Sequence, residues 1–474
     1  KILVFLLFLI FFLYTNFTFS LEITLNLYDP LSKSFSTPIP GTLKTIINKD
    51  KIQNNKILPI HKIIEMESGI NTRSIYGDFS SGSKTTIDIR GMGAQAKSNV
   101  LILINGQRLN NIDMSEIDFP SIPLDSIEKI EILKGNSASV LYGDGAIGGA
   151  INFITNNGSE GKNYNELTIK TGSFNSKSIN YNFSDHTKYY SITSSISNHV
   201  SDGYRDENEQ LQNNFSSDIK YRAGVVDHNF SLNFNEQIMS TPSDRSQIQL
   251  YSDRRGSDTP DDFINSLGAS LMYASDYKLN NNSSLIISSS IRIKDSYSDL
   301  QSTSYPSYND TSLFNYQFSP RVKKYNNIFN NFILSTIGLD LQYATYESFR
   351  KESKNVIPLH TYNAWQSTQS IYTQNSININ EITKLGFGVR FQRNIIGIGD
   401  KLNTQAPDYA GWQTEHSTFK DESFNYSTNI GLERKFKNNI TLFGRIGNGF
   451  RYPNIDDRIG GSGDSSFSLK TQKS

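Results

Sequence analysis

The chain has 474 residues, with 46 acidic and 46 basic side chains and no cysteine. A net charge of zero gives no electrostatic sign of nucleic-acid binding, and the lack of cysteine excludes a disulfide framework and thiol catalysis. The 25 tyrosines and 29 phenylalanines occur together with a mean hydropathy of −0.45. This combination disfavours a helical membrane protein, which needs runs of about 20 apolar residues, and is compatible with a transmembrane β-barrel, in which only alternate residues need be apolar.

The strongest apolar run covers residues 2–13 and follows Lys1. Its length fits the apolar region of a secretory signal better than a spanning helix, and the small residues Thr18 and Ser20 suit cleavage after Ser20. We therefore expect residues 1–20 to be a signal peptide, with a retained N-terminal anchor as the alternative. Residues 21–40 hold three prolines and predict an extended N-terminal segment.

The first predicted elements after this segment are a strand at 45–48 and a short helix, with Gly69 as its stop. Pro59 suits the first turn of that helix. The side chains that fall on one helical face are Ile57, Ile60, Ile63 and Ile64. The polar stretches 75–84 and 109–119 are predicted to be flexible insertions between strands.

Residues 85–155 predict a compact unit of short strands joined by glycine turns. Three apolar runs, 87–89, 100–104 and 127–133, are each followed by a glycine that permits positive φ. A fourth strand is predicted at 149–155. Residues 143–148 match the dinucleotide pattern G-x-G-x-x-G, but that fingerprint requires a helix to begin at the glycines, and here a β-branched strand follows. We interpret these glycines as tight turns that allow close packing.

After residue 156 the chain changes to alternating segments separated by Asn, Ser, Asp and Gly clusters. In one of them Leu385, Phe387, Val389 and Phe391 alternate with Gly386, Gly388, Arg390 and Gln392. We count roughly thirteen such strands between residues 167 and 447, more than one soluble sandwich needs. The apolar sides are predicted to face lipid and the polar sides to line a wet lumen.

Three stretches carry a specific family resemblance: IDIRGMG, VLILINGQRL and IEKIEILKGNSASVLYGDGAIGGAINFIT. In this order and spacing they resemble the plug domain of TonB-dependent outer-membrane receptors of the siderophore and cobalamin type. The resemblance implies a mostly β protein, with an N-terminal α+β plug at 41–157 inside a large antiparallel transmembrane β-barrel that begins at 158 and continues to 474. Barrels of this kind have about 22 strands, and an open edge in lipid is costly, so we expect the sequence to be C-terminally incomplete.

The resemblance also implies the function: active import of a scarce ligand across the outer membrane. The implied partners are a TonB-type energy transducer in the periplasm, the small-molecule ligand and outer-membrane lipid. A ferric siderophore-type chelate is our expected cargo, with cobalamin or haem as alternatives. An uncoupled passive or adhesive barrel is a rival, and a barrel enzyme is another, although we find no catalytic constellation in a recognisable context.

The resemblance assigns three sets of residues. The candidate TonB box, a segment that pairs with the transducer by strand addition, contains Leu25, Asn26 and Leu27 within the alternating stretch 21–27; an accidental alternation is the alternative. The residues expected to gate or shape the plug are Arg90, Gly91, Glu128, Glu131, Lys134, Gly135, Gly143, Gly148 and Gly149. The residues expected to contact ligand from apical loops are Tyr76, Asp78, Phe79, Asn110, Asn111 and Asp113.

No cofactor or metal site is predicted. The six histidines are scattered without ligand spacing. Asp456 and Asp457 are adjacent, and on a strand they would face opposite sides, so we interpret them as charges at a loop end.

Overall fold

The computed structural model describes residues 39–74, 85–93, 96–113, 124–155, 163–301, 306–328, 331–408, 418–436, 440–459 and 469–474, with Ser115, Ile117, Phe119 and Ile122. The predicted signal peptide, the TonB-box candidate Leu25 to Leu27, and the loop residues Tyr76, Asp78 and Phe79 lie outside these residues.

The N-terminal unit is a small mixed sheet with short helices around it. Its sheet has the order β1-β6-β7-β4-β5, in which β4 and β7 are parallel and the other pairs antiparallel. Strands β2 and β3 form a separate antiparallel pair. The elements are β1 (Lys44–Asn48), α2 (Lys49–Asn54), α3 (Ile60–Glu65), β2 (Ile70–Ser74), β3 (Thr85–Ile89), α4 (Ala96–Asn99), β4 (Val100–Ile104), β5 (Gln107–Arg108), β6 (Ile127–Lys134), α5 (Ser139–Tyr142) and β7 (Gly149–Thr155).

The predicted apolar runs of this unit are confirmed as strands β3, β4, β6 and β7. Gly91, Gly106 and Gly135, which follow β3, β4 and β6, all have positive φ, as expected. Asn105 and Gly106 make the two-residue turn between β4 and β5, both with positive φ, which is the geometry that Asn-Gly favours in hairpins. The isoleucines of β4, β6 and β7 pack with those of α3 in the buried core.

The expected helical face was wrong at one position. Ile60, Ile63 and Ile64 are buried in α3, but Ile57 lies before the helix and is 93% exposed. Pro59 is the N-cap in an extended conformation, and a proline also disfavours helical backbone in the residue before it. The helix therefore begins at Ile60, and Ile57 does not share its face.

The second unit is a single antiparallel sheet of 13 strands in sequence order, from β8 to β20. The count agrees with the roughly thirteen strands expected. Among the described residues β8 and β20 are the two edges of this sheet, and no pairing joins them. The strands are β8 (Tyr164–Thr171), β9 (Lys177–His186), β10 (Tyr190–Ser201), β11 (Gln210–Ala223), β12 (Val226–Ser240), β13 (Phe263–Asn280), β14 (Ser283–Leu300), β15 (Ser307–Ile328), β16 (Asn331–Lys351), β17 (His360–Asn378), β18 (Thr383–Leu402), β19 (Phe419–Lys435) and β20 (Thr441–Gly447).

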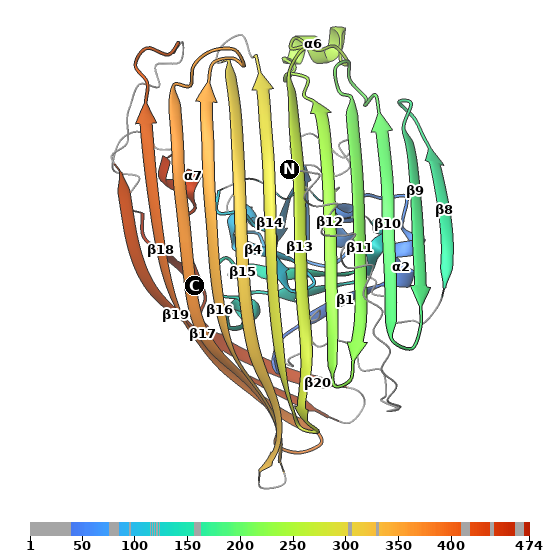
Figure 1. Cartoon of the computed structure of the whole chain (residues 1–474), viewed down its shortest axis with the longest axis vertical. Helices are drawn as coiled ribbons and strands as arrows, with labels where there is room; N and C mark the ends of the chain where they lie inside the picture. Colours follow the sequence, from blue (N-terminus) through green and yellow to red (C-terminus); the bar gives the residue numbers. More distant parts are fainter. Residues whose placement is uncertain are drawn as a thin grey trace.

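The sheet curves around the N-terminal unit, which we call the plug, and forms a wall with the plug on its inner side (Figure 1). One end of the wall has tight turns such as 224–225 and 281–282, and the other has long connections such as 241–262, which carries α6 (Gln247–Ser252). We call these the short-turn end and the long-loop end. After β20 the chain forms β21 (Phe450–Arg451), α7 (Ile455–Ile459) and β22 (Gln472–Lys473).

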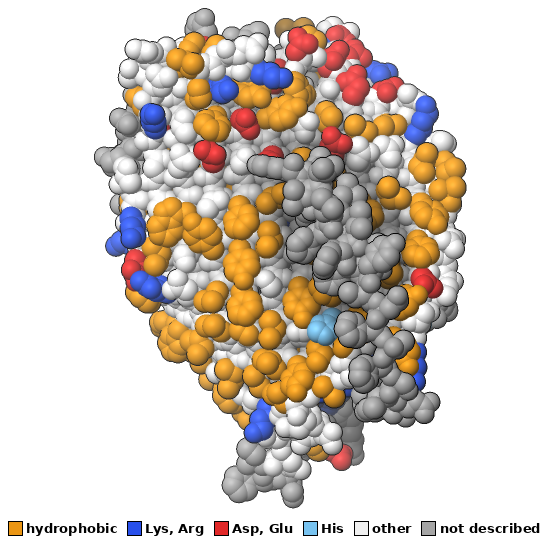
Figure 2. Space-filling model, in the orientation of Figure 1, with side chains coloured by type: hydrophobic (Ala, Val, Ile, Leu, Met, Phe, Trp, Pro, Cys, Tyr) orange, Lys and Arg blue, Asp and Glu red, His pale blue; other side chains and the backbone are white. Residues whose placement is uncertain are grey.

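The two faces of the wall differ in chemistry, as the alternation predicts. Inward positions such as Asn180, Asn182 and Ser184 are buried, whereas the intervening Ile179 and Tyr181 are exposed on the outside. Apolar side chains spread over much of the outer surface in Figure 2. A patch of this extent is unusual on a soluble monomer and suits contact with lipid. None of the described helices is long and apolar enough to span a membrane.

Candidate functional site

The contact surface between plug and wall can be followed along strand β18. Its inward residues are buried and alternate with outward ones; from the short-turn end they read Gly386, Gly388, Arg390, Gln392 and Asn394. The two glycines leave room for the plug to approach the wall. The larger polar side chains that follow them contact the plug. The inner face of β18 therefore fits the plug closely near the short-turn end and is polar toward the long-loop end.

Arg390 is the largest fully buried side chain of the wall, with 1% of its surface exposed. Its Nη1 donates to the Asp340 carboxylate of β16 at 2.7 Å and to the Leu141 carbonyl of plug helix α5 at 3.2 Å. Its Nε donates to the Gln392 side chain at 2.9 Å, and its guanidinium lies over the Tyr372 ring. A buried charge of this kind needs both a counterion and full hydrogen bonding, and here the plug backbone supplies part of the set.

Gly143 ends α5 directly opposite this arginine. Its φ is +77°, and a Cβ atom at this position would overlap the Gln392 side chain and lie 2.7 Å from the Arg390 Nε. A glycine is therefore required both by the backbone conformation and by the proximity of the wall. The expected close-packing role of this glycine loop is confirmed, and the strand β7 that follows excludes the nucleotide-loop interpretation.

Further hydrogen bonds join plug and wall elsewhere. Asn136 of the plug donates to the Gly447 carbonyl at 2.8 Å and accepts from Arg445 of β20 at 2.9 Å. At the end of β7, the Thr155 hydroxyl donates to the Asp218 carboxylate of β11 at 2.5 Å. The plug is thus attached to distant parts of the wall through polar groups.

The segment after β20 returns to the plug. The Asp144 carboxylate accepts from the Tyr452 backbone N–H at 2.7 Å and from the Arg108 guanidinium at 3.3 Å. In α7, the Ile455 N–H donates to the Ile112 carbonyl at 3.0 Å. This segment therefore binds the plug loop that follows β5.

Asp456 and Asp457 were interpreted from the sequence as charges at a loop end, and the structure places them in a short helix instead. Both belong to the first turn of α7, where negative charge is favourable. Asp456 pairs with Arg350 at 3.4 Å, and Asp457 pairs with Arg451 and accepts from the Asn454 N–H. Among the described residues no cluster of His, Cys, Asp and Glu could hold a metal ion.

The predicted gating charges lie in different places. Glu131 on β6 is 1% exposed and pairs with Lys44 of β1 at 3.0 Å and Lys129 at 3.4 Å, so its network is inside the plug sheet. The Arg90 guanidinium packs on Gly135, where a Cβ atom would lie 2.5 Å from Nη1. Lys134 donates to the Ser68 carbonyl.

The other predicted gating residues lie on β6 or at the beginning of β7. Glu128 is half-buried on β6. The Gly148 N–H donates to the Asn99 carbonyl at 2.8 Å, and Gly149 begins β7. No described contact tests a gating role, so these assignments stay predictions.

Asn110, Asn111 and Asp113, the three described residues of the predicted ligand set, lie together beside two adjoining polar cavities that are open to solvent. The larger cavity lies between the plug loop and strands β14 to β17; among its polar lining residues are Arg108, Asn110, Asn111, Arg292, Gln366 and Asn454. Asp113 lines the smaller, adjoining cavity.

The side chains of this set already have structural partners. Asn110 accepts from the Ile102 N–H at 2.7 Å and donates to the Val100 carbonyl, which fixes the loop to β4. Asn111 accepts from Arg292 of the wall at 2.5 Å. Burial raises the pKa of the Asp113 carboxyl above its usual value, and the nearby negative charge of Asp456 adds to the shift.

Arg390 and Asp340 were not predicted as functional candidates. One signal was present in each case: a charged residue at an inward position of an alternating strand otherwise lined by small or neutral side chains. Pairing across two strands that are 50 residues apart in the sequence could not be read from that signal.

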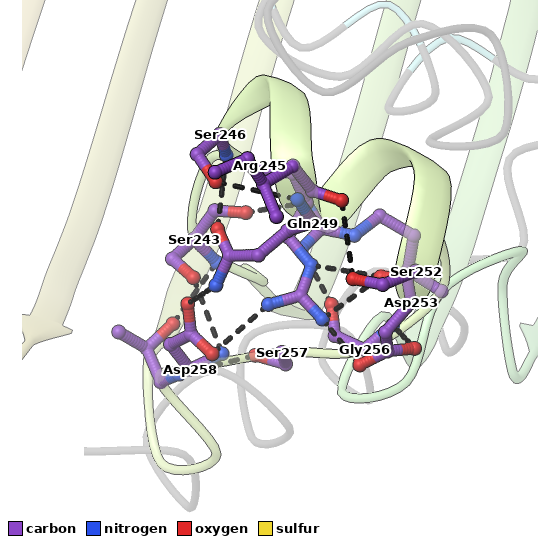
Figure 3. Close-up of polar contacts among 12 residues, drawn as sticks. Ser243, Arg245, Ser246, Gln249, Ser252, Asp253, Gly256, Ser257 and Asp258 are labelled. Carbon is purple, nitrogen blue, oxygen red and sulfur yellow. Dashed lines mark hydrogen bonds and ion pairs between the residues drawn. The ribbon is translucent and has the colours of Figure 1, made fainter.

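At the long-loop end, the connection 241–262 is folded around Arg245 (Figure 3). This guanidinium is 5% exposed and pairs with Asp253 at 2.6 Å and Asp258 at 2.9 Å. Ser246 and Gln249 form a capping box at the start of α6. Acidic side chains gather on this end of the molecule in Figure 2.

A plug held by polar contacts on the inner side of a curved antiparallel wall is the arrangement of a plugged β-barrel, here open between β8 and β20 among the described residues. The family model of the TonB-dependent receptor plug domain matches residues 39–150. Residues 39–150 therefore form a plug domain of the TonB-dependent receptor type.

Sequence relatives match within the same region. The vitamin B12 transporter BtuB of Photobacterium profundum is 31% identical over 133 residues, which are 28% of this chain and 20% of the relative. The ferrienterobactin receptor of Escherichia coli is 35% identical over 131 residues, which cover 25% of this chain and 17% of the relative. The chain therefore matches about a fifth of the length of these curated relatives.

Solved structures match over most of the chain and show the fold. The unliganded ferric citrate transporter FecA superposes with a TM-score of 0.74 at 12% identity, covering 91% of this chain and 65% of that one. The ferric yersiniabactin uptake receptor FyuA of Yersinia pestis gives 0.71 at 13% identity, with 94% and 68% covered.

Proposed function

We propose that this chain belongs to an outer-membrane receptor that imports a ferric chelate of the siderophore type with energy from a TonB-type transducer. The observation that carries the proposal is the plug itself: it is attached to the inner wall through Arg390 and Asn136 and leaves a polar cavity beside its loop after β5. A plug of this kind prevents leakage, and binding of ligand must favour the state from which transport proceeds.

The chemistry of the cavity supports an anionic ligand. Arg108 and Arg292 contribute two guanidinium groups, and the amides of Asn111, Gln366 and Asn454 surround them. Guanidinium groups bind carboxylate or other oxygen-rich anions with two parallel hydrogen bonds. Ferric chelates commonly present such oxygens at their surface.

Cobalamin is the second candidate, because one matching relative is named a vitamin B12 transporter and the plug alone does not separate the two ligand classes. Haem remains an alternative of the same fold. An uncoupled passive or adhesive barrel is the rival from another class. Since the relatives are named as transporters and receptors, we do not propose an enzyme.

Whole-cell uptake tests the cargo. Cells that express the full-length receptor are compared with cells that lack it, using labelled ferric siderophores, haem and cobalamin. Receptor-dependent uptake of one ferric chelate supports the proposal, and uptake of cobalamin alone replaces it. The variant Arg292→Ala is expected to weaken chelate binding, whereas Arg393→Ala, on the outward side of β18, is a matched arginine control.

Energy coupling has a separate test. Deleting residues 21–28 from the full-length receptor is expected to abolish uptake while ligand binding is retained. Unchanged uptake would instead favour the passive barrel.

A further inference from the structure

The plug enters the wall through a proline-glycine turn. The Thr42 N–H donates to the Ile39 carbonyl at 3.2 Å, and Gly41 between them has φ +79°. A proline at the second position and a glycine with positive φ at the third are typical of a type II turn. The turn lies immediately before β1, which is an edge strand of the plug sheet and pairs only with β6 among the described strands.

This turn is pressed against glycines of two neighbouring wall strands. A Cβ atom at Gly386 of β18 would lie 2.6 Å from the Pro40 Cδ, and one at Gly431 of β19 would overlap the Pro40 carbonyl oxygen. Gly386 and Gly431 are direct partners in the ladder and both face inward. Gly41 in turn approaches the Gly444 carbonyl of β20, where its own Cβ would overlap.

The place of this contact matters. Gly386 is three residues after the start of β18, next to the short-turn connection 379–382. Barrels of the outer membrane have their short turns on the periplasmic side. The contact therefore lies where the plug meets the side from which a transducer would pull.

We propose that Gly386 and Gly431 form a seat for the Pro40–Gly41 turn, and that this seat must release the turn before a pull on the preceding chain reaches the plug sheet. The proposal rests on the energy-coupled uptake proposed above. Once the turn leaves the seat, the next contacts in line are the Lys44–Leu133 backbone pair and the Lys44–Glu131 ion pair at the beginning of β1. Release of the turn from the seat is thus the first of two steps that protect the plug from opening without ligand. Separation of β1 from β6 is the second.

The first experiment fills the seat in the full-length receptor and reads the turn directly. A Thr42→Cys reporter, in a chain that otherwise lacks cysteine, is labelled with a maleimide in the purified, unliganded protein. Gly431→Ala is expected to raise the labelling rate by roughly tenfold, the factor that 1.4 kcal/mol of overpacking corresponds to. Gly444→Ala is the matched control, because its Cβ has nothing within 4 Å.

Equal labelling in the Gly431→Ala and Gly444→Ala proteins would overturn the proposal. If Gly431→Ala fails to fold, Gly386→Ala fills the same seat from the neighbouring strand. The labelling rates of the Gly431→Ala and Gly386→Ala proteins do not depend on transport. They therefore test the seat even if no uptake is found for any ligand.

The second experiment closes the seat covalently. A disulfide between Pro40→Cys and Gly386→Cys is expected to leave ligand binding intact and abolish uptake, with recovery after reduction. The pair Pro40→Cys and Gly444→Cys should not bridge, because a Cβ at 444 has nothing within 4 Å and so does not reach the turn. Full uptake through the oxidised Pro40–Gly386 pair would overturn the proposal, whereas absence of uptake in the reduced form would count against the proposed function instead.

Discussion

The guanidinium of Arg390 on the wall donates to the carbonyl oxygen of Leu141 in the plug at 3.2 Å. The same nitrogen binds the Asp340 carboxylate at 2.7 Å, so one buried charge is shared between a wall strand and the plug backbone. Release of the plug would remove two acceptors from this charge, the carbonyls of Val140 and Leu141, and leave the ion pair in place. The wall can therefore remain folded while the plug moves.

Arg390→Ala is expected to loosen the plug and to destabilise the protein by about 3–5 kcal/mol, because it removes the ion-pair partner of the buried Asp340. Urea unfolding measures the change in stability, and proteolysis of the plug measures how far it is loosened. The double variant Arg390→Met with Asp340→Leu should recover much of the stability, since it removes both charges. Arg393→Ala on the same strand, whose ion pair with Glu422 lies on the outer face, should leave the stability unchanged. Equal effects of Arg390→Ala and Arg393→Ala would show that the buried pair is not what holds this region.

Gly143→Ala is expected to weaken plug seating by about 1–3 kcal/mol, because the methyl group meets Arg390 and Gln392. Gly224→Ala is the matched control: its φ of +61° imposes a similar backbone strain, but its Cβ has nothing within 4 Å. The midpoint of urea unfolding compares the two. A shift of the same size in both variants would assign the effect to backbone strain alone.

Arg90→Ala and Glu131→Ala are expected to change plug gating more than barrel assembly. Glu131→Ala leaves Lys44 and Lys129 without their shared carboxylate at the β1–β6 pair, so β1 should separate more readily. Leakage of a small antibiotic into cells reports gating, and heat-modifiable gel mobility reports assembly. Loss of membrane insertion in either variant would mean that these residues are structural instead.

Asp113→Asn should stabilise the plug loop increasingly as the pH rises. The raised pKa means that the folded protein binds this proton more tightly than the unfolded chain does. The contribution of Asp113 is therefore most favourable below the ordinary aspartate pKa of about 3.9 and decreases as the pH rises through the folded value. Urea unfolding of both proteins between about pH 4 and 7 measures the difference, and a difference independent of pH would contradict the assignment.

Arg245→Ala is expected to open the connection 241–262, because this side chain joins Asp253 and Asp258. Chymotrypsin cleavage after the exposed Tyr251 should become faster. Arg254→Ala removes a neighbouring positive charge and leaves both ion pairs intact, so its cleavage rate should stay that of the wild type. A faster rate in both variants would indicate a general effect of charge.

The strands and their two faces follow from the sequence alone. Alternation through residues such as Phe387 and Arg390 sets which side chains face outward, since successive residues of a strand point to opposite sides. Gly91, Gly106 and Gly135 marked the turns of the plug because positive φ is a local property of one residue. Ile57 was misplaced because the local effect of Pro59 outweighed the helical spacing.

Which distant groups meet is a property of the tertiary structure. The binding of Arg390 to Asp340 and to α5, and the fit of Pro40 against Gly386 and Gly431, join segments that lie far apart in the sequence. Such contacts depend on strand register and on how the plug is placed in the wall, and no local pattern encodes either. The glycines of β18 were visible in the sequence as inward positions of a strand, but the turn that they accommodate was not.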